Sequence, residues 1–117
     1  EAINHFDMPR FAVNSAADML QLLQQVNLPT LTMQVDLYHM ARMGEDLQQL
    51  LRQHWQRIGH IQFADAPGRG APGSGELPWA TLFRLIGELP YAGYCGAEYK
   101  PGGNTEATLG WLDQYRG

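Results

Sequence analysis

The sequence predicts an α/β fold in which strands and helices alternate four times around a parallel sheet. Three observations support this prediction. Apolar residues recur at helical spacing in four segments, a short segment of strand-forming residues precedes each of them, and glycine or proline separates many of the segments. The 117 residues are enough for one domain, so residues 1–117 are expected to form a single unit.

The chain is expected to open with the end of a strand, at residues 1–4, and then a helix. Ser15 and Asp18 have the spacing of a capping box, in which Ser15 caps the helix and an acid stands at its third position. Apolar residues follow at helical spacing up to Val26. Pro29 comes where the helix cannot continue.

The next strand is predicted at residues 31–39, which are rich in strand formers and apolar on both faces, as in a strand covered on both sides. A helix is predicted from about residue 45 to residue 57. Its acids come first and its arginines last, an order that suits the helix dipole. The third strand is predicted at residues 58–64.

A loop dense in glycine and proline follows at residues 67–76, ahead of a third helix at residues 79–89. The last strand is predicted at residues 93–99, where glycines would let a ligand or another backbone approach closely. A final helix is predicted to begin at Asn104 or Thr105.

The composition limits the classes of partner. The net charge is −4 and Lys100 is the only lysine, so the chain lacks the basic surface that binding to nucleic acid or to an anionic membrane requires. No apolar run is long enough to span a membrane. A small molecule or another protein is therefore the expected partner.

Cysteine usage and the start of the chain give two further expectations. Cys95 is the only cysteine, which excludes an intrachain disulfide and a cysteine-rich zinc module. Its place between Tyr94 and Gly96 in a predicted strand is typical of a small core residue. From the first residues we expect no signal peptide and a cytoplasmic location.

Each of the four predicted strands carries a carboxylate or amide side chain that interrupts an otherwise apolar stretch. Parallel strands gather functional groups at their carboxyl ends. Three carboxylates buried together need protons, partners or a cation, and carboxylate and amide oxygens are typical ligands of Mg²⁺ or Mn²⁺. We therefore expect a divalent metal held by Glu1, Asp36, Gln62 and Glu98. The alternative is that each acid merely ends a strand and points to solvent.

Two further residues are candidates for contact with a ligand. His39 follows Asp36 by three residues and leaves the strand at the same edge, where it could donate to a substrate oxygen; a structural role at this corner is equally open. Arg69 stands in the loop at residues 67–76, which lacks the phosphate-loop motif and is better suited to cover a ligand. Arg69 could hold a carboxylate through two hydrogen bonds, or the loop could be an ordinary surface loop with a solvated arginine.

Six stretches, in their order and spacing, resemble the hydroxypyruvate isomerase family of xylose-isomerase-like TIM barrels. They are residues 1–4 (EAIN), 36–40 (DLYHM), 58–65 (IGHIQFAD), 67–69 (PGR), 72–76 (PGSGE) and 96–101 (GAEYKP). The resemblance covers essentially the whole chain but not a whole barrel, which takes about 250 residues. It implies that residues 1–117 correspond to strand five through helix eight, a half-barrel whose missing first half would supply the other wall of the pocket.

The resemblance also implies an activity and roles for residues. It implies that the four oxygen-bearing residues bind the metal and that two of them, Glu1 and Glu98, are the acid/base pair. His39 and Arg69 match positions that contact substrate in related sugar epimerases. The implied reaction converts hydroxypyruvate to 2-hydroxy-3-oxopropanoate (tartronate semialdehyde) by proton transfer through an enediolate.

Two alternatives to this activity remain open. A 2-oxotetronate isomerase would share both the fold and the chemistry. A catalytically silent half-barrel would instead associate with another chain, because four strand–helix units leave exposed strand edges. Its partner would be a second copy or the missing N-terminal half.

Overall fold

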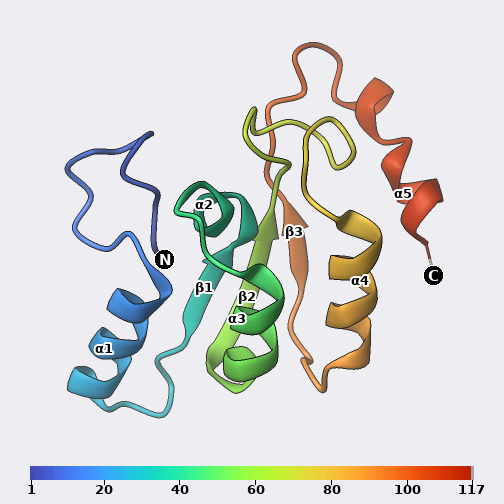
Figure 1. Ribbon diagram of the computed structural model, residues 1–117. Helices are drawn as coiled ribbons and strands as arrows, with labels where there is room; N and C mark the ends of the chain where they lie inside the picture. The colour runs from blue at the N-terminus through green and yellow to red at the C-terminus, as the bar shows by residue number, and fades with distance from the viewer. Residues whose placement is uncertain (117) are drawn as a thin grey trace.

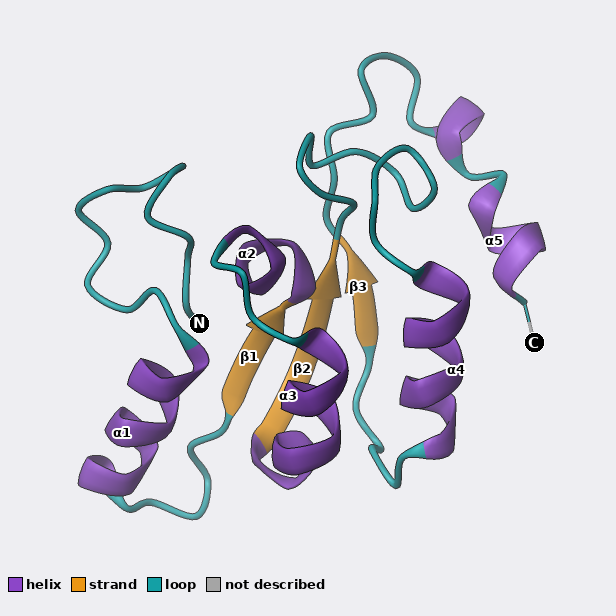
Figure 2. Cartoon of the chain, in the orientation of Figure 1, coloured by secondary structure: helices purple, strands orange, loops and turns teal. Residues whose placement is uncertain are grey.

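Three parallel strands form one sheet in the computed structural model, which describes residues 1–116. The strands are β1 (Met33–Asp36), β2 (Ile58–Phe63) and β3 (Cys95–Ala97), in that order across the sheet. The helices are α1 (Ala16–Val26), α2 (Leu37–Arg42), α3 (Leu47–His54), α4 (Trp79–Glu88) and α5 (Trp111–Tyr115), with short 3₁₀ turns η1 (Trp55–Arg57) and η2 (Glu106–Thr108). Helices α1, α3 and α4 lie along one face of the sheet, and α2 lies at the carboxyl end of β1 (Figure 1, Figure 2).

The strand register places polar residues together on one face of the sheet. Asp36 of β1 pairs with Gln62 of β2, and Gln62 pairs in turn with Gly96 of β3. Gln34 pairs with His60 on the same face, because side chains two residues apart along a strand point the same way. We call Gln34, Asp36, His60 and Gln62 the polar face.

The opposite face of the sheet packs against the helices and forms the core. Val35, Ile61 and Phe63 alternate with the residues of the polar face and are buried. The Phe63 ring centroid lies 5.6 Å from that of Trp79 in α4 and 5.5 Å from that of Trp111 in α5. Because burying a large apolar side chain contributes about 1.5–3 kcal/mol, this aromatic group holds α4 and α5 onto the sheet.

The parallel alternation of strands and helices is as predicted, but the sheet has three strands where the sequence predicted four. In the described part of the chain, residues 1–4 pair with no strand; the Ile3 N–H donates instead to Val13 O at 3.0 Å. This segment is nonetheless well packed, since Ala2 and Asn4 are fully buried. A four-residue segment is too short for its pattern to reveal whether it pairs.

Several predicted elements end at other residues than expected. The strand predicted at residues 31–39 stops at Asp36, because the Asp36 carboxylate accepts the Tyr38 N–H at 2.9 Å and caps α2. The helix predicted at residues 45–57 is α3 followed by η1. The predicted final helix is split into η2 and α5, with Gly110 directly ahead of α5.

The predicted cap of α1 is confirmed. Ser15 Oγ accepts the Asp18 N–H at 3.1 Å, and the Asp18 carboxylate accepts the Asn14 N–H at 3.3 Å. At the other end of α1, Asn27 adopts the left-handed conformation (φ 51°), and its N–H donates to Leu23 O.

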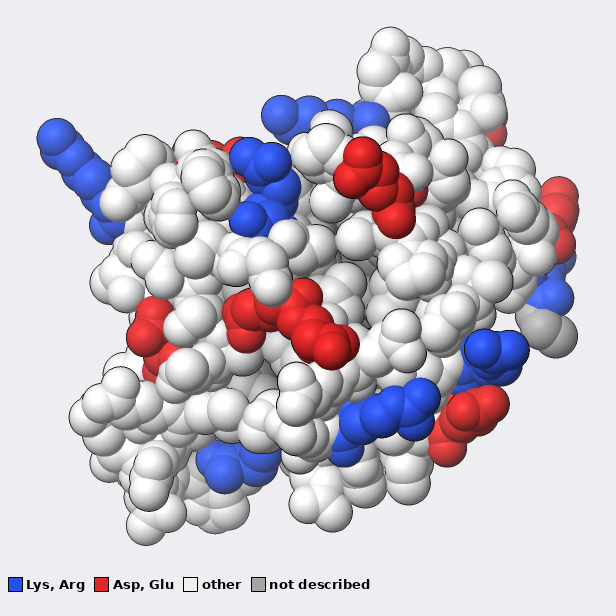
Figure 3. Space-filling model, in the orientation of Figure 1, with Lys and Arg blue, Asp and Glu red and all other residues white. Residues whose placement is uncertain are grey.

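Cys95 differs from its prediction. It is exposed rather than packed in a core, because β3 is short and is one of the two edge strands of the described sheet. Other surface features agree with the composition. Acidic and basic side chains are interspersed on the face shown in Figure 3. Among residues 1–116, none of the helices has both the length and the apolar composition needed to cross a membrane.

Candidate functional site

Asp36 is a buried carboxylate at the carboxyl end of β1, only 1% exposed. Its Oδ1 accepts the Tyr38 N–H at 2.9 Å, whereas Oδ2 has no hydrogen-bond partner among the described residues. Burial raises the pKa of this carboxyl above its ordinary value, and the opposing effects of His39 and the Tyr38 N–H are smaller. A buried acceptor without a donor costs free energy, so Oδ2 is an atom that a bound cation or a ligand O–H would satisfy.

Gln34 connects two of the predicted metal ligands. Its Nε2 donates to Gln62 Oε1 at 2.8 Å and to Glu1 Oε2 at 3.2 Å. Gln62 is the residue that pairs with Asp36 in the sheet. Glu1 and Gln62 are therefore joined through Gln34, and Gln62 lies beside Asp36 in the sheet, although the three residues come from distant parts of the sequence.

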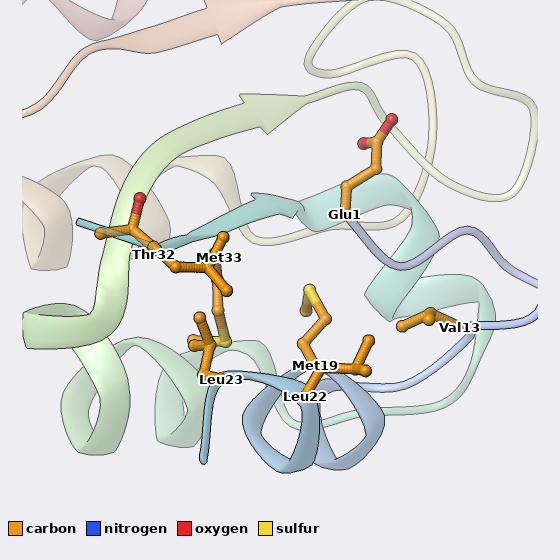
Figure 4. A pocket seen from close by; sticks show the side chains of 8 residues that line it. Glu1, Val13, Met19, Leu22, Leu23, Thr32 and Met33 are labelled. Carbon is orange, nitrogen blue, oxygen red and sulfur yellow. The ribbon is translucent and has the colours of Figure 1, made fainter. Parts of the chain in front are cut away.

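Glu1 also lies at one end of an apolar cavity of about 160 Å³ between α1 and β1. The cavity is lined chiefly by apolar side chains, among them Met19, Leu22, Leu23 and Met33. In Figure 4 the Glu1 carboxylate points away from these side chains. The cavity is thus apolar, whereas the Glu1 carboxylate belongs with the polar side chains around Gln34.

His39, in α2, faces Asp36 from a buried position. It is 3% exposed, and its Nε2 lies 3.9 Å from Asp36 Oδ2. On the other side of the ring, Nδ1 accepts the backbone N–H of Asn4 at 3.3 Å and lies 2.8 Å from Asn4 Nδ2. The imidazole also stacks on the Tyr38 ring, with the centroids 5.1 Å apart. The structure therefore places His39 beside Asp36, and Asn4 contacts the opposite side of the His39 ring.

Asp7 anchors the segment that carries Asn4. Its N–H donates to Asn4 Oδ1 at 2.9 Å, and its Oδ2 accepts from Asn4 Nδ2 at 3.2 Å and from Tyr38 Oη at 2.7 Å. The hydrogen bond from Tyr38 holds the pKa of the Asp7 carboxyl below its ordinary value, against an opposing effect of burial. Burial and the same hydrogen bond raise the pKa of the Tyr38 phenol. At neutral pH the phenol is therefore a donor and the Asp7 carboxylate an acceptor.

Glu98 follows β3 by one residue, and Arg69 lies beside it. The Glu98 N–H donates to Phe63 O at 2.9 Å, which extends the pairing of β3 with β2. Glu98 Oε2 lies 3.9 Å from Arg69 Nη2, and the Arg69 guanidinium carbon is 5.0 Å from the centroid of the Tyr38 ring. Because Glu98 is 55% exposed, this ion pair contributes little to stability. Arg69 is also close enough to Asp36 to oppose the rise in its pKa.

Asp65 organises the loop that carries Arg69. It is 1% exposed, and its N–H donates to Gly70 O at 2.8 Å. Its carboxylate accepts four backbone N–H groups at 2.8–3.1 Å, those of Ala66, Gly73, Gly75 and Leu77. Burial raises the pKa of Asp65, but these hydrogen bonds outweigh it and leave the pKa below its ordinary value. The loop is therefore folded around a buried negative charge.

The structure brings the predicted site residues to one edge of the sheet without joining the acids into a closed group. Glu1 and Gln62 are linked through Gln34, Asp36 pairs with Gln62 in the sheet, and Glu98 pairs with Arg69. Among the described residues, no three His, Cys, Asp or Glu side chains are close enough together to hold a metal ion. The donor atoms themselves fit a hard divalent cation, since they are carboxylate and amide oxygens and one buried carboxylate oxygen lacks a partner.

Four residues that shape this edge are not singled out as site residues by the sequence: Asn4, Asp7, Gln34 and Asp65. For three of them the sequence carries a local signal. Asn4 and Asp7 have the spacing of a turn in which asparagine accepts a backbone N–H, and Asp65 stands directly before a glycine-rich loop with many free N–H groups. Gln34 has no such signal, because its role depends on the register of β1 and β2.

Comparison with known proteins identifies relatives of the chain. The hydroxypyruvate isomerase of Escherichia coli (strain K12) is 45% identical over 116 residues, which are 99% of this chain and 45% of that protein. The 2-oxo-tetronate isomerase of Cupriavidus necator is 38% identical over 117 residues, which are 100% of this chain and 45% of that protein. The chain thus spans less than half the length of the relatives that it matches.

Solved structures agree with the sequence comparison. A family 2 AP endonuclease from Brucella melitensis superposes with a TM-score of 0.92 at 34% identity, over 99% of this chain and 45% of that one. The 3-keto-D-glucoside 4-epimerase of E. coli superposes with a TM-score of 0.80 at 27% identity, over 97% of this chain and 44% of that one. Residues 1–115 also match the family described as xylose isomerase-like TIM barrel. The alternating strands and helices of this chain agree with that match. The chain therefore belongs to the xylose isomerase-like TIM barrel family.

Proposed function

We propose that the protein carrying this chain is an isomerase that converts hydroxypyruvate to 2-hydroxy-3-oxopropanoate with the help of a divalent cation. The observation that carries the proposal is the position of Asp36. It is a buried carboxylate at the carboxyl edge of a parallel sheet, it pairs with Gln62, and one of its oxygens lacks a donor among the described residues. The name of the relative that is 45% identical supports the choice of substrate.

Glu1, Asp36, Gln62 and Glu98 are the residues that would hold the cation. Their oxygens are the ligands that Mg²⁺ and Mn²⁺ prefer, and Gln34 already holds Glu1 and Gln62 together through its Nε2. A bound cation would polarise the substrate carbonyl and stabilise the negative charge that develops on the substrate oxygens.

Glu1 and Glu98 are the proposed acid/base pair. One carboxylate takes a proton from the hydroxymethyl carbon of hydroxypyruvate, which leaves an enediolate. The other, in its protonated form, gives a proton to the neighbouring carbon, which had been the ketone, and the hydroxyl proton passes to the former ketone oxygen. The product is an aldehyde next to a secondary alcohol, so atoms and electrons balance without any oxidant.

Arg69 and His39 are the proposed substrate-binding residues. The Arg69 guanidinium stands between the Tyr38 ring and Glu98, where it would attract the carboxylate of a 2-oxo acid and place its carbon chain beside the base. His39 Nε2 faces the free oxygen of Asp36, where it would contact a substrate oxygen. A cytoplasmic setting and a role in glyoxylate metabolism are part of the proposal and rest on the likeness to hydroxypyruvate isomerases alone.

Two other candidate functions each have an observation in their favour. Relatives named 2-oxo-tetronate isomerase, 38% and 33% identical, favour a four-carbon substrate for the same proton transfer. The other candidate is a chain that is inactive by itself and associates with another chain. It is favoured because, among the described residues, no three acidic, histidine or cysteine side chains lie close enough to hold a metal.

The test is an assay of two samples, the protein that carries this sequence and the 117-residue chain alone, with hydroxypyruvate and 2-oxo-tetronate. Each sample is treated with a chelator and then given Mg²⁺ or Mn²⁺. We expect the protein to turn over hydroxypyruvate, the chelator to abolish this turnover, and the metal to restore it. A preference for 2-oxo-tetronate would select the second candidate, and activity absent from the chain alone would support the silent chain. No turnover of either substrate with any metal would reject the isomerase.

A further inference from the structure

The side-chain amide of Asn4 has a defined orientation. Its Oδ1 accepts the backbone N–H of Asp7 at 2.9 Å, and a backbone N–H is always a donor. The other end of the amide is therefore the NH₂ group, which donates to Asp7 Oδ2 at 3.2 Å and faces His39 Nδ1 at 2.8 Å. Asn4 is fully buried, so water does not compete for these contacts.

His39 Nδ1 consequently receives two N–H groups from one residue. The backbone N–H of Asn4 approaches it at 3.3 Å, and the NH₂ group of the same residue lies 2.8 Å away. A ring nitrogen that accepts a hydrogen bond carries no proton, so the proton of the neutral imidazole is on Nε2. The ring is 3% exposed and stacked on Tyr38, which restricts its rotation.

The surroundings of the other ring nitrogen agree with this assignment. Nε2 faces Asp36 Oδ2, a buried acceptor, at 3.9 Å. Donors therefore lie on the Nδ1 side of the imidazole and an acceptor on the Nε2 side. The distance is too long for a direct hydrogen bond between Nε2 and Oδ2, so the Nε2 proton is free to be shared with a ligand between or beside them.

We propose that Asn4 is a positioning residue, which fixes His39 as the Nε2–H tautomer so that the imidazole donates a hydrogen bond to an alcohol or carbonyl oxygen of the substrate. The substrate class in this inference rests on the proposed function. His39 then binds and orients, and the proton transfers at carbon belong to other residues. Asp7 supports Asn4 in turn, because its carboxylate is held by the Tyr38 phenol.

The test is the tautomer of His39 in the full 117-residue chain, read by ¹⁵N NMR with no substrate or metal present. We expect an unprotonated Nδ1, a protonated Nε2, and a scalar coupling across the hydrogen bond between Nδ1 and a nitrogen of Asn4. His5, His54 and His60 serve as internal controls in the same spectrum. A protonated Nδ1, or rapid averaging between the two tautomers, would overturn the proposal.

Two variants test the role of Asn4 directly. Asn4→Asp replaces the NH₂ group by an acceptor oxygen of the same size, and we expect it to move the His39 proton to Nδ1. Asn14→Asp is the matched control from the same part of the chain, and it should leave the His39 signals in place. Asn4→Asp keeps the backbone N–H that approaches Nδ1, so the variant isolates the side-chain NH₂ group. An unchanged His39 spectrum in the folded variant would overturn the role of the Asn4 side chain, because the backbone N–H alone would then set the tautomer; if that variant does not fold, a coupling from Nδ1 to the side-chain nitrogen of Asn4 in the parent chain decides.

Kinetics then separate this inference from the proposed function. In the protein that carries this sequence, Asn4→Asp is expected to lower kcat/KM for hydroxypyruvate about 10- to 100-fold while metal binding persists. Unchanged kcat/KM in a variant whose tautomer has changed would overturn the donor role. If the parent protein shows the expected tautomer but turns over no 2-oxo acid, the isomerase proposal fails and the assignment of the tautomer stands.

Discussion

Asp36 combines three roles in one residue. It is the last residue of β1, its Oδ1 caps α2, and its Oδ2 is a buried oxygen without a partner among the described residues. The cap stabilises the fold, whereas the unpaired oxygen and the buried charge oppose folding. This combination is typical of functional sites, where stability is given up for reactivity.

Replacing Asp36 separates these roles. In Asp36→Asn the side-chain carbonyl can still accept the Tyr38 N–H, and the buried charge is gone, so we expect the free energy of unfolding to change by less than about 1 kcal/mol. Asp36→Ala loses the cap and should cost about 1–2 kcal/mol. Urea denaturation of both variants in the presence of a chelator measures the difference. A large loss of stability in Asp36→Asn would mean that the ionised form makes stabilising contacts.

Glu98 is the proposed acid or base whose removal is easiest to interpret, because it is exposed and contributes little to packing. We expect Glu98→Gln to lower kcat at least about 100-fold, since the amide cannot transfer the proton, and to retain the divalent cation because its oxygen remains. Steady-state kinetics and Mn²⁺ binding by the protein that carries this sequence are the measurements. Glu88→Gln, at the exposed end of α4, is the control. Unchanged turnover in Glu98→Gln would remove Glu98 from the proton transfer.

At the scale of elements, the segment between β2 and α4 is ordered by Asp65 rather than by secondary structure. The carboxylate accepts backbone N–H groups from both ends of the loop, those of Ala66 and Leu77 among them. The loop then carries Arg69, whose φ of 60° lies in the left-handed region, to a place between Tyr38 of α2 and Glu98, the residue after β3. The geometry of the proposed substrate-binding arginine therefore depends on a buried residue four positions earlier.

Close packing around Asp65 gives a stability prediction for two glycines of this loop. A Cβ at Gly75 would overlap Ala66 O and lie 2.8 Å from Asp65 Oδ1, whereas a Cβ at Gly68 would meet nothing within 4 Å. We expect Gly75→Ala to lower the free energy of unfolding by about 2 kcal/mol or more and Gly68→Ala to change it by less than about 0.5 kcal/mol. Urea denaturation measures both, and equal effects would mean that the loop is not packed as described.

The pH dependence of stability should also report on this loop. The folded-state pKa of Asp65 lies below its ordinary value, so its hydrogen bonds stabilise the fold above that ordinary value and are lost as the pH falls through the folded pKa. We expect the free energy of unfolding to decrease below about pH 4. In Asp65→Asn, stability should be lower at pH 7 and fall less steeply with acid. Denaturation curves at pH 7 and pH 3 test this, and parallel slopes in both proteins would contradict it.

The sequence predicts the elements well where a pattern is long, and poorly where one residue serves two elements. The apolar spacing of α1 and α4 leads to the right positions, because a full amphipathic face must be buried. It does not reveal that β1 ends at Asp36, since residues 37–40 are as apolar as the strand and are equally buried in α2. Residues 1–4 show the opposite limit, because Ala2 and Asn4 are buried without any strand pairing.

The candidate site is predictable in its residue types more than in its contacts. Asp36 and Gln62 lie side by side on neighbouring parallel strands, as the predicted topology requires. The link through Gln34 and the contact of Asn4 with His39 join residues far apart in sequence. Such contacts follow from register and loop path, which no local spacing encodes.

At the scale of the whole molecule, the described surface keeps several large apolar side chains exposed. Four of them belong to α1 or the segment after it, namely Leu22, Val26, Leu28 and Leu31, each 39–56% exposed. The chain also spans less than half the length of its relatives. Exposed apolar surface of this kind favours association, with another copy or with the remainder of a barrel.

We therefore expect the 117-residue chain to associate with itself in a concentration-dependent way. Leu22→Glu places a charge in the exposed apolar group on α1 and should weaken the association, because a buried unpaired charge is costly. Leu109→Glu, ahead of α5 at the other end of the molecule, is the control (Figure 1). Sedimentation velocity over a range of concentrations measures the effect. A monomer at all concentrations would show that α1 does not mediate association.

Position 34 offers a starting point for redesign of the ion preference. Gln34 Nε2 donates to both Glu1 Oε2 and Gln62 Oε1. This one side chain therefore sets the distance between the two oxygens in the absence of a ligand. A longer or shorter residue at this position would widen or narrow that spacing while leaving every oxygen donor in place. If the proposed cation binds at these oxygens, its preferred ionic radius would depend on residue 34 as well as on the ligands themselves.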